Sequence, residues 1–387
     1  MKMNALRHFV FYSFLFLNLL ADTSVLFTSE KSLINKISTG CPEWMQEQID
    51  KDLAPYMKEK ISIGEMNQRF LEFPPEFYVV KFIIKDNQIF IENLFEESGV
   101  NYRLEGFENA FKDLCSSVGL PDVTFFVFLH DGLSQPDIYC HELVDFPLFV
   151  MSRASTEFYD ERSIFIPDYE GLRQNYQVLK KKDVVQFEFP WEKKKSRLVW
   201  RGSTAQSGYD NSIFPCYVSA HMNHENATLF TRFIVCQFSQ KYPHVIDAKF
   251  TFLADLENTF PYIKKLQGAW MSYEKQFSYK YHILLNGNAA PYTNSGWKFF
   301  SNSLLFIPEN YWTQWYYGAL KPYIHYVPTA RHLEDLYEKI QWAQEHDQEC
   351  KVIAKNARDF AMNNLTRMDS LVYIYFLLSR YSLLIVD

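Results

Sequence analysis

The chain has few cysteines and lacks the patterns that define several classes of protein. Its six cysteines are scattered over 387 residues and include no Cys-x-x-Cys pair, so the sequence indicates no zinc or other metal site. No Gly-x-Gly-x-x-Gly pattern follows an expected strand, which argues against a nucleotide-binding oxidoreductase. The net charge of -7 offers no basic footprint, so we expect no nucleic acid partner.

The chain is rich in residues that build hydrophobic cores. Its hydrophobic fraction of 48% is ordinary for a globular protein, whereas its aromatic fraction of 18% is high. A length of 387 residues suits two domains of roughly 150–200 residues each. The aromatic rings either fill these cores or line a sugar or base site. The cysteines either form disulfides in an oxidising compartment or remain buried thiols.

The N-terminus has the pattern of a secretory leader. Lys2 and Arg7 precede the apolar run 9–21. This run is too short, and too often interrupted by polar residues, for a membrane span. We expect a signal peptide or signal anchor over residues 1–25, with an amphipathic segment that touches a membrane as the alternative. No other segment looks able to span a bilayer. This predicts a membrane-associated or secretory (periplasmic) protein, with the cytoplasmic face of a membrane as the alternative.

Apolar strands alternate with amphipathic helices along the chain, which predicts an α/β fold. The span 168–195 has the least regular pattern, and we expect a domain hinge there. Helices are expected from about Pro42 and over 107–118, 232–239, 295–301, 333–345, 352–364 and 371–384. Strands are expected over 77–84 and 88–91 as a hairpin, and over 124–129, 146–151, 163–166, 198–200, 245–248, 281–285 and 303–307.

The span 280–328 is the most informative part of the sequence. It begins with a buried strand and a turn, Asn286-Gly287-Asn288, whose residues tolerate positive φ. A helix and a second buried strand follow, which makes a βαβ unit. The N-terminus of a helix beside such a turn can receive a phosphate group. Many βαβ units bind nothing, however, so this pattern alone is weak.

The same span resembles the signature of glycosyltransferase family 90. That family includes capsule-associated proteins, bacterial lipopolysaccharide glycosyltransferases and Rumi-type protein O-glucosyltransferases. The matching residues, in chain order, are Lys280-Tyr281, Gly287-Asn288, Ser301-Asn302-Ser303-Leu304, Trp315-Tyr316-Tyr317, Leu320-Lys321-Pro322 and His325-Tyr326-Val327-Pro328.

The resemblance implies a GT-B-like architecture, in which two Rossmann-like α/β domains face a cleft and a C-terminal helix crosses back. On this basis we expect an N-terminal acceptor-side domain over residues 30–190. A C-terminal domain that binds the nucleotide sugar is expected over 195–365. The crossing helix is expected over 366–387.

Asp131 is the candidate catalytic base. It follows the buried strand 124–129 in the context FLHDGL, at the carboxyl end where open α/β sheets place ligands. This context resembles the strand-end Asp that acts as base in the Rumi-like members. The alternative is a turn residue, because Asp-Gly is a very common turn.

The donor-binding candidates carry positive charge or allow close approach to phosphate. Trp200-Arg201-Gly202-Ser203 resembles the family's WRG(S/A) motif, and Arg232 matches the arginine that follows it. Glycine admits a phosphate to the backbone, and arginine binds it in a bidentate way. Lys280 and the turn Asn286-Gly287-Asn288 complete the set. The alternative for each arginine is an ordinary ion pair.

Two positions depart from the family pattern. Asn286 stands where the family has Asp, but Rumi-like members also lack that acid. Asn294 falls where the family has an arginine that contacts the donor diphosphate, and its loss could cost several kcal/mol of transition-state stabilisation. Lys298, one helical turn further on, could substitute as a point charge. Otherwise the protein binds its donor weakly, uses an altered donor or is inactive.

These observations predict an inverting glycosyltransferase that moves a hexose or pentose from a UDP-sugar to a hydroxyl. The acceptor would be a cell-envelope glycan of the lipopolysaccharide kind, which the bacterial side of the resemblance favours, or a protein. The resemblance implies no metal and no cofactor besides the UDP-sugar co-substrate. The alternative is a weakened or inactive relative that binds glycan or acts as a scaffold, and Asn294 motivates it.

Overall fold

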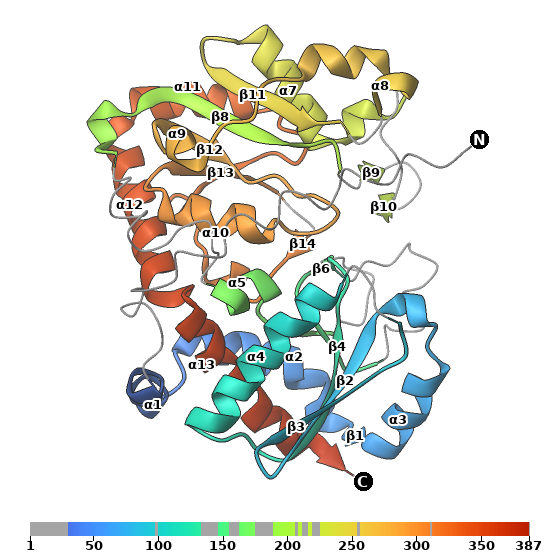
Figure 1. Cartoon of the computed structure of the whole chain (residues 1–387). Coiled ribbons are helices and arrows are strands. Elements are labelled where there is room, and N and C mark those ends of the chain that lie inside the picture. The colour runs from blue at the N-terminus through green and yellow to red at the C-terminus, as the bar shows by residue number, and fades with distance from the viewer. Residues whose placement is uncertain are drawn as a thin grey trace, which may run out of the picture.

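The computed structural model describes residues 30–96, 100–132, 146–154, 162–174, 189–205, 208–210, 216–218, 225–253, 256–309 and 312–386. These residues form two α/β halves, each built on a five-stranded sheet (Figure 1). The N-terminal sheet occupies the lower half of the view and the C-terminal sheet the upper half. The expected α/β class is therefore confirmed. The expected signal segment, residues 1–25, lies outside the described residues.

The N-terminal sheet is mixed, with strand order β3-β2-β4-β5-β7. Its strands are β2 (Val79–Lys85), β3 (Gln88–Asn93), β4 (Val123–Phe128), β5 (Leu148–Val150) and β7 (Ile164–Phe165). Strand β2 runs antiparallel to β3 and β4, whereas β4, β5 and β7 are parallel. The expected hairpin is confirmed, because Asp86 and Asn87 take positive φ values of 50° and 59° in its turn. This hairpin makes the half less purely Rossmann-like than expected.

The C-terminal sheet is wholly parallel, with strand order β11-β8-β12-β13-β15. Its strands are β8 (Lys195–Ser203), β11 (Ile246–Phe252), β12 (Tyr279–Ile283), β13 (Leu304–Pro308) and β15 (Val327–Thr329). The first strand lies second in the sheet, so the winding reverses between β8 and β12. Open α/β sheets bind ligands outside the carboxyl ends of strands at such a reversal. The carboxyl ends of β8 and β12 are therefore the place to look for a donor site.

Helices surround and connect both sheets. They are α1 (Glu30–Ser38), α2 (Glu43–Lys58), α3 (Ile63–Glu72), α4 (Asn101–Ser117), α5 (Tyr169–Gln174), α7 (Thr231–Lys241), α8 (Leu256–Thr259), α9 (Tyr273–Phe277), α10 (Tyr292–Phe300), α11 (Leu336–Glu345), α12 (Asp347–Asn364) and α13 (Arg367–Tyr381). Helix α10 begins three residues before the expected start, directly after Pro291. The expected hinge 168–195 begins with helix α5, because the Asp168 carboxylate accepts hydrogen bonds from the amides of Glu170 and Gly171, both at 3.1 Å.

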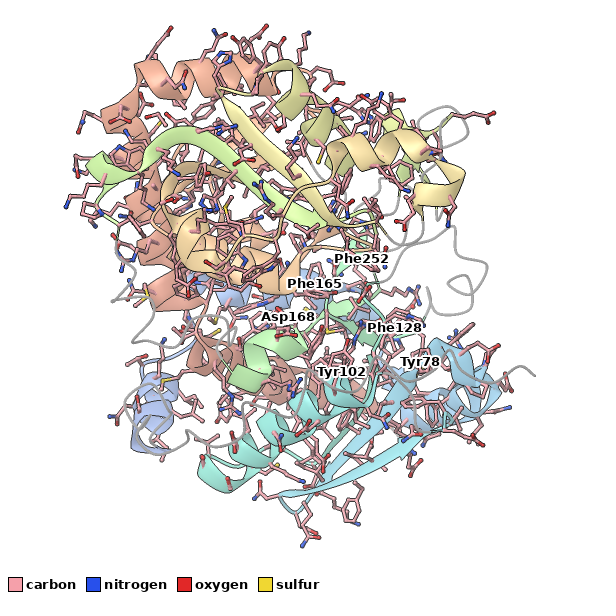
Figure 2. All side chains as sticks on the ribbon, turned by 45° about the horizontal axis from the view of Figure 1, so that its top comes forward. Tyr78, Tyr102, Phe128, Phe165, Asp168 and Phe252 are labelled. Atoms are coloured by element: carbon pink, nitrogen blue, oxygen red, sulfur yellow. The ribbon has the colours of Figure 1, made fainter. Side chains whose placement is uncertain are left out.

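Side chains from both halves meet between the two sheets. Asp168, labelled in Figure 2, is fully buried there. The ring of Tyr169 on α5 lies 6.1 Å from the ring of Tyr292 on α10. Helix α5 follows the N-terminal sheet and α10 belongs to the C-terminal half, so this contact joins the halves.

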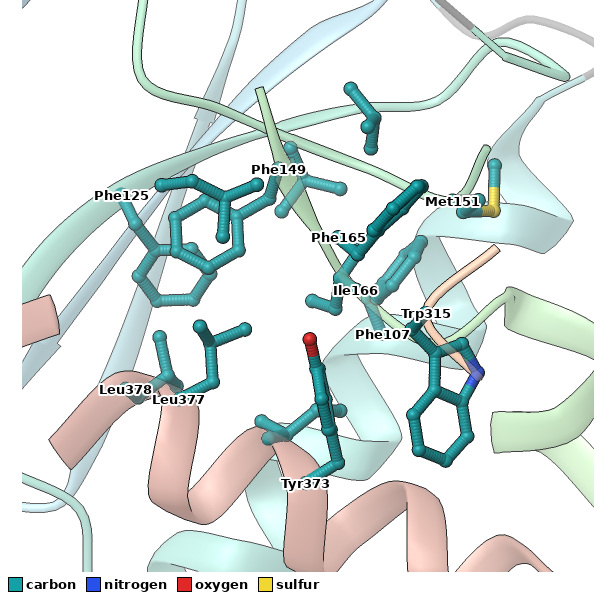
Figure 3. Packing of buried hydrophobic residues seen from close by; sticks show 14 of the residues in the cluster. Phe107, Phe125, Phe149, Met151, Phe165, Ile166, Trp315, Tyr373, Leu377 and Leu378 are labelled. Atoms are coloured by element: carbon teal, nitrogen blue, oxygen red, sulfur yellow. The ribbon is translucent and has the colours of Figure 1, made fainter. Parts of the chain in front are cut away.

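Helix α13 crosses back to the N-terminal sheet, as the GT-B-like expectation required. Figure 1 shows α12 descending from the upper half and α13 continuing across the lower half toward the C-terminus. A capping box starts α13, in which Thr366 and Asp369 exchange hydrogen bonds with each other's backbone. Figure 3 shows Tyr373 and Leu377 of α13 facing the sheet, and the ring of Tyr381 lies 5.0 Å from that of Phe149. The core of the N-terminal half thus includes the end of the chain.

A short strand pair also joins the two halves, next to a buried ion pair within the N-terminal half. The Arg153 guanidinium donates to the Asp52 carboxylate at 2.9 Å, and both side chains are almost inaccessible to water. Arg153 lies in β6 (Arg153–Ala154), which pairs with β14 (Trp312–Thr313) of the C-terminal half. The remaining short strands are β1 (Ile61–Ser62), β9 (Gly208–Asp210), β10 (Cys216–Val218) and β16 (Ile385–Val386).

Four cysteines among the described residues are free thiols, and two of them are fully buried. Burial raises the pKa of Cys41 to about 11 and that of Cys350 to about 12. A thiol that stays protonated is a poor nucleophile, so neither is suited to redox chemistry. None of the helices in the described ranges is both long and apolar enough to span a membrane.

Candidate functional site

The predicted base and the predicted donor turn meet between the two sheets. Asp131 lies just beyond β4, and Asn288 lies just beyond β12; the Asn288 amide nitrogen is 3.5 Å from Oδ2 of Asp131. Next to this contact, a Cβ on Gly132 would lie 2.5 Å from the Trp312 ring and 3.0 Å from Cβ of Ala289. Only glycine fits so close an approach. The carboxyl ends of both sheets therefore face each other at Asp131.

Arg103, which was not predicted, holds the other oxygen of Asp131. Its Nη2 lies 2.6 Å from Oδ1 of Asp131, and its Nη1 donates to the Leu129 carbonyl at 2.6 Å. The Tyr102 hydroxyl accepts from Nε at 3.1 Å, and the guanidinium lies 5.3 Å from the centre of the Tyr169 ring. Burial opposes the charge, but the Asp131 carboxylate together with Tyr102 and Tyr169 outweighs it, so the pKa of Arg103 is raised. The sequence offered no local pattern for this contact.

Tyr292 lies in the same region, on the donor side. It is the first residue of α10, and among the described residues its buried hydroxyl finds no hydrogen-bond partner. Burial raises the pKa of Tyr292 well above its ordinary value, and the nearby charges of Asp131 and Asp168 raise it further. The hydroxyl therefore stays protonated next to two carboxylates, as a potential hydrogen-bond donor.

Arg232 ties the two strand ends at the point where the sheet reverses its winding. Its Nε donates to the Asn286 carbonyl at 2.6 Å, beyond β12, and its Nη1 donates to the Ala205 carbonyl at 2.6 Å and the Ser203 carbonyl at 3.2 Å, at the end of β8. A Cβ on Gly287 would lie 2.9 Å from Nη2 of Arg232. The structure thus brings these predicted donor residues together around one guanidinium.

The Trp200 indole packs against that guanidinium, and Gly202 packs against the indole. The indole of Trp200 is buried, and the Arg232 guanidinium lies 5.8 Å from its ring centre. A Cβ on Gly202 would lie 2.4 Å from the same indole. Glycine is therefore required two residues after the tryptophan. This packing gives a physical reason for two residues of the Trp-Arg-Gly-Ser run.

Arg201 and Lys280 lie elsewhere. Neighbouring residues of a strand face opposite sides of the sheet, so Arg201 points away from Trp200 and pairs with Asp247 at 2.8 Å. Lys280 is the second residue of β12, at the end of the strand opposite to the turn. Its ammonium pairs with Asp347. Arg201 thus makes the ordinary ion pair that was its alternative interpretation, and Lys280 also makes an ion pair.

Lys298 is buried inside the C-terminal half. Its ammonium donates to the Ile283 carbonyl at 2.8 Å, and only 2% of the residue is exposed. Burial lowers the pKa of Lys298 to about 7, and the charge of Arg232 contributes to the shift. In this arrangement its ammonium is not open to a donor diphosphate. Asn294 lies in the first turn of α10, and its side chain is outside what the structure describes.

The predicted residues therefore fall into two groups, and the first, which lies away from the facing strand ends, contains Arg201, Lys280 and Lys298. The residues at the facing strand ends, or directly supporting them, are Asp131, Trp200, Gly202, Ser203, Arg232, Asn286, Gly287 and Asn288. Within the described ranges, no group of three or more His, Cys, Asp or Glu side chains is placed to hold a metal ion.

The chain belongs to glycosyl transferase family 90, whose pattern it matches over residues 36–386. The resemblance seen in the sequence is thereby confirmed. The chain is 26% identical to "Protein O-glucosyltransferase 2" of Danio rerio over 351 residues, covering 87% of this chain and 61% of the relative. It is 25% identical to "Protein O-glucosyltransferase 3" of Homo sapiens over 360 residues, covering 89% of this chain and 62% of the relative. The chain thus spans about three fifths of the length of these relatives.

A solved glycosyltransferase from Rickettsia africae has a distant likeness to this chain. The identity is 10%, with a TM-score of 0.39, over 76% of this chain and 84% of the other. A likeness this weak bears on neither mechanism nor substrate.

Proposed function

We propose that the protein is an inverting glycosyltransferase that moves a hexose or pentose from a UDP-sugar to an acceptor hydroxyl. Membership of family 90 supports transfer of a sugar. The observation that carries the proposal is the position of Asp131, whose Oδ2 lies 3.5 Å from Asn288 of the turn at the end of β12. A carboxylate there can receive a proton from a hydroxyl that approaches a sugar bound at the turn.

The proposed reaction is a single displacement. The acceptor oxygen attacks the anomeric carbon from the side opposite the diphosphate and forms the new glycosidic bond. The bond between the anomeric carbon and the diphosphate oxygen breaks, and its electron pair leaves with UDP. The hydroxyl proton moves to Oδ2 of Asp131, which later releases it to water. The configuration at the anomeric carbon is inverted.

The donor diphosphate would bind where β12 leads into α10. The amides of the turn after Ile283 and of the first turn of α10 lie at the carboxyl end of a strand, beside the reversal in the sheet. Arg232 is the positive charge tied to this turn, through the Asn286 carbonyl. No metal ion or other cofactor is part of the proposal.

The acceptor is proposed to be a protein hydroxyl. Both relatives named above are called protein O-glucosyltransferases, which favours a protein over a lipopolysaccharide-like glycan. We propose that the chain works in a secretory or membrane-associated setting, through residues 1–25, with the cytoplasmic face of a membrane as the alternative.

A second candidate is a weakened or inactive relative that binds glycan or acts as a scaffold. The observation that favours it is that each of the four predicted donor-side cations is held inside the chain. Arg201, Arg232, Lys280 and Lys298 donate to carboxylates or backbone carbonyls. Neutralising a departing diphosphate is an electrostatic task, and a cation held elsewhere contributes less to it.

UDP binding by calorimetry and UDP release from a panel of UDP-sugars separate the candidates. Turnover by the wild type would support the transferase and identify the donor. Binding and turnover only in Asn294→Arg would mean that the native chain has lost its diphosphate contact. No binding by either protein would favour the scaffold.

A further inference from the structure

We propose that Arg103 is a positioning residue that orients the carboxylate of Asp131 for proton transfer. The inference rests on the proposed function and adds a residue to it. Arg103 belongs to α4 in the N-terminal half, 28 residues before Asp131, and no predicted motif includes it. It would act through Asp131 rather than by touching the donor or the acceptor.

The guanidinium makes two hydrogen bonds to the residues that directly follow β4. Nη2 is 2.6 Å from Oδ1 of Asp131, and Nη1 is 2.6 Å from the carbonyl oxygen of Leu129, two residues earlier. Arginine presents its donors in a rigid planar fork, so two such contacts fix both the backbone and the carboxylate. A lysine, with one ammonium on a flexible stem, cannot reproduce this fork.

The guanidinium is itself held in place by aromatic side chains. The Tyr102 hydroxyl accepts from Nε at 3.1 Å, and the ring centre of Tyr169 lies 5.3 Å from the guanidinium carbon. The rings of Tyr102 and Tyr169 meet edge to face at 5.2 Å. Only 13% of the Arg103 side chain is exposed, so the pair is partly shielded from water. A shielded pair of fixed geometry holds its partner better than an exposed one.

This arrangement assigns different tasks to the two oxygens of Asp131. Oδ1 is occupied by Arg103, whereas Oδ2 faces Asn288 of the donor turn. When Oδ2 receives the acceptor's proton, Oδ1 becomes a carbonyl oxygen and still accepts from Nη2. The Arg103 contact therefore persists through the reaction. Before transfer, the guanidinium is also a counter-ion for the ionised carboxylate that a general base requires.

A purely structural role is the competing explanation, because the Leu129 contact also ties α4 to β4. The two roles differ in what they change. A structural tie affects stability, and through it all activities alike. A positioning residue affects kcat for transfer and leaves UDP affinity nearly unchanged. The reason is that displacing a catalytic group by about 1 Å can lower the rate on the order of 100-fold.

The test uses Arg103→Met and Arg103→Lys in the full chain, with Arg173→Met as a matched control. Arg173 lies on the adjacent α5 and pairs with Glu105 at 3.8 Å, without a contact to Asp131. Transfer kcat, the Kd for UDP by calorimetry and thermal unfolding are measured for each. We expect Arg103→Met to lower kcat roughly 10- to 100-fold with a Kd within about twofold of the wild type. Arg103→Lys should recover part of kcat, and Arg173→Met should match the wild type.

A double-variant cycle with Asp131→Asn completes the test. If Arg103 acts through Asp131, then adding Arg103→Met to Asp131→Asn causes little further loss of kcat. A folded Arg103→Met with wild-type kcat, or a fully additive loss in the double variant, would overturn the inference. If Arg103→Met does not fold, wild-type kcat in Arg103→Lys overturns it instead. A wild-type protein without any UDP-sugar turnover would refute the proposed function itself, before any variant is compared.

Discussion

Replacing the buried Lys298 with methionine should stabilise the protein. The ammonium donates to the Ile283 carbonyl, and burial lowers the pKa of Lys298 from 10.5 to about 7. That difference lowers the free energy of unfolding by about 5 kcal/mol, because the folded chain must either keep the buried group charged or deprotonate it, whereas the unfolded chain does neither. Methionine has similar length and no charge. Losing the hydrogen bond offsets about 1–3 kcal/mol, so we expect a net gain of about 2–4 kcal/mol at neutral pH.

The stability of the wild type should also depend on pH in a way that the Lys298→Met variant does not. Between about 7 and 10.5, the unfolded chain binds a proton at Lys298 that the folded chain has lost. Stability rises with pH wherever the unfolded state binds more protons, so the wild type should gain stability through this window. Below about pH 7 both states are protonated, and the cost is fully present. Lys194, whose pKa burial also lowers to about 7, contributes the same slope to both proteins and cancels in the comparison.

Urea unfolding at about pH 7 and about pH 9, at constant ionic strength, measures both effects. The advantage of Lys298→Met should shrink by about 2–3 kcal/mol between these two conditions. Lys355→Met is the matched control, because that side chain is 69% exposed on α12 and its removal should change neither stability nor slope. A Lys298→Met variant that is less stable at pH 7, or that keeps the full slope of the wild type, would refute the reasoning.

Two further substitutions test the packing that builds the site. Gly202→Ala would place a Cβ 2.4 Å from the buried Trp200 indole, so denaturant titration should show a loss of about 1–3 kcal/mol together with weaker UDP binding; an unchanged midpoint would mean that the indole can move aside. Asp52→Asn removes the carboxylate charge that pairs with the buried Arg153 guanidinium and should cost about 3–5 kcal/mol in the same titration; a loss below about 1 kcal/mol would show that the pair does not stabilise the N-terminal half.

The sequence predicted the strands and the facing strand ends well, because those features depend on local composition. The buried runs that became β4 and β13 are apolar and bounded by turn residues. The turn at Asp86-Asn87 carries its own conformational preference. Asp131 was expected at a ligand-binding edge because ligands gather at the carboxyl ends of strands, and the structure places it 3.5 Å from Asn288.

The parts of the site that the sequence did not reveal depend on contacts between residues that are far apart in the sequence. Arg103 reaches Asp131 only because α4 packs beside β4, and no spacing in the sequence marks that contact. Lys298 was expected to substitute as a point charge at the donor, but its place on α10 directs its ammonium into the core, where it donates to the Ile283 carbonyl. The sequence could have shown that Arg201 lies outside the site. Successive side chains of a strand face opposite sides of the sheet, so Arg201 and its neighbour Trp200 cannot both face the site.

The proposed mechanism depends most directly on Asp131 as the base that receives the acceptor's proton. The measurement that tests it compares acceptor-dependent transfer by the wild type and by Asp131→Asn, with the Kd for UDP measured on both proteins. We expect Asp131→Asn to lower kcat roughly 10²–10⁴-fold and to retain UDP affinity, since a general base contributes about that much. Full transfer activity in Asp131→Asn would contradict it and would place the base elsewhere.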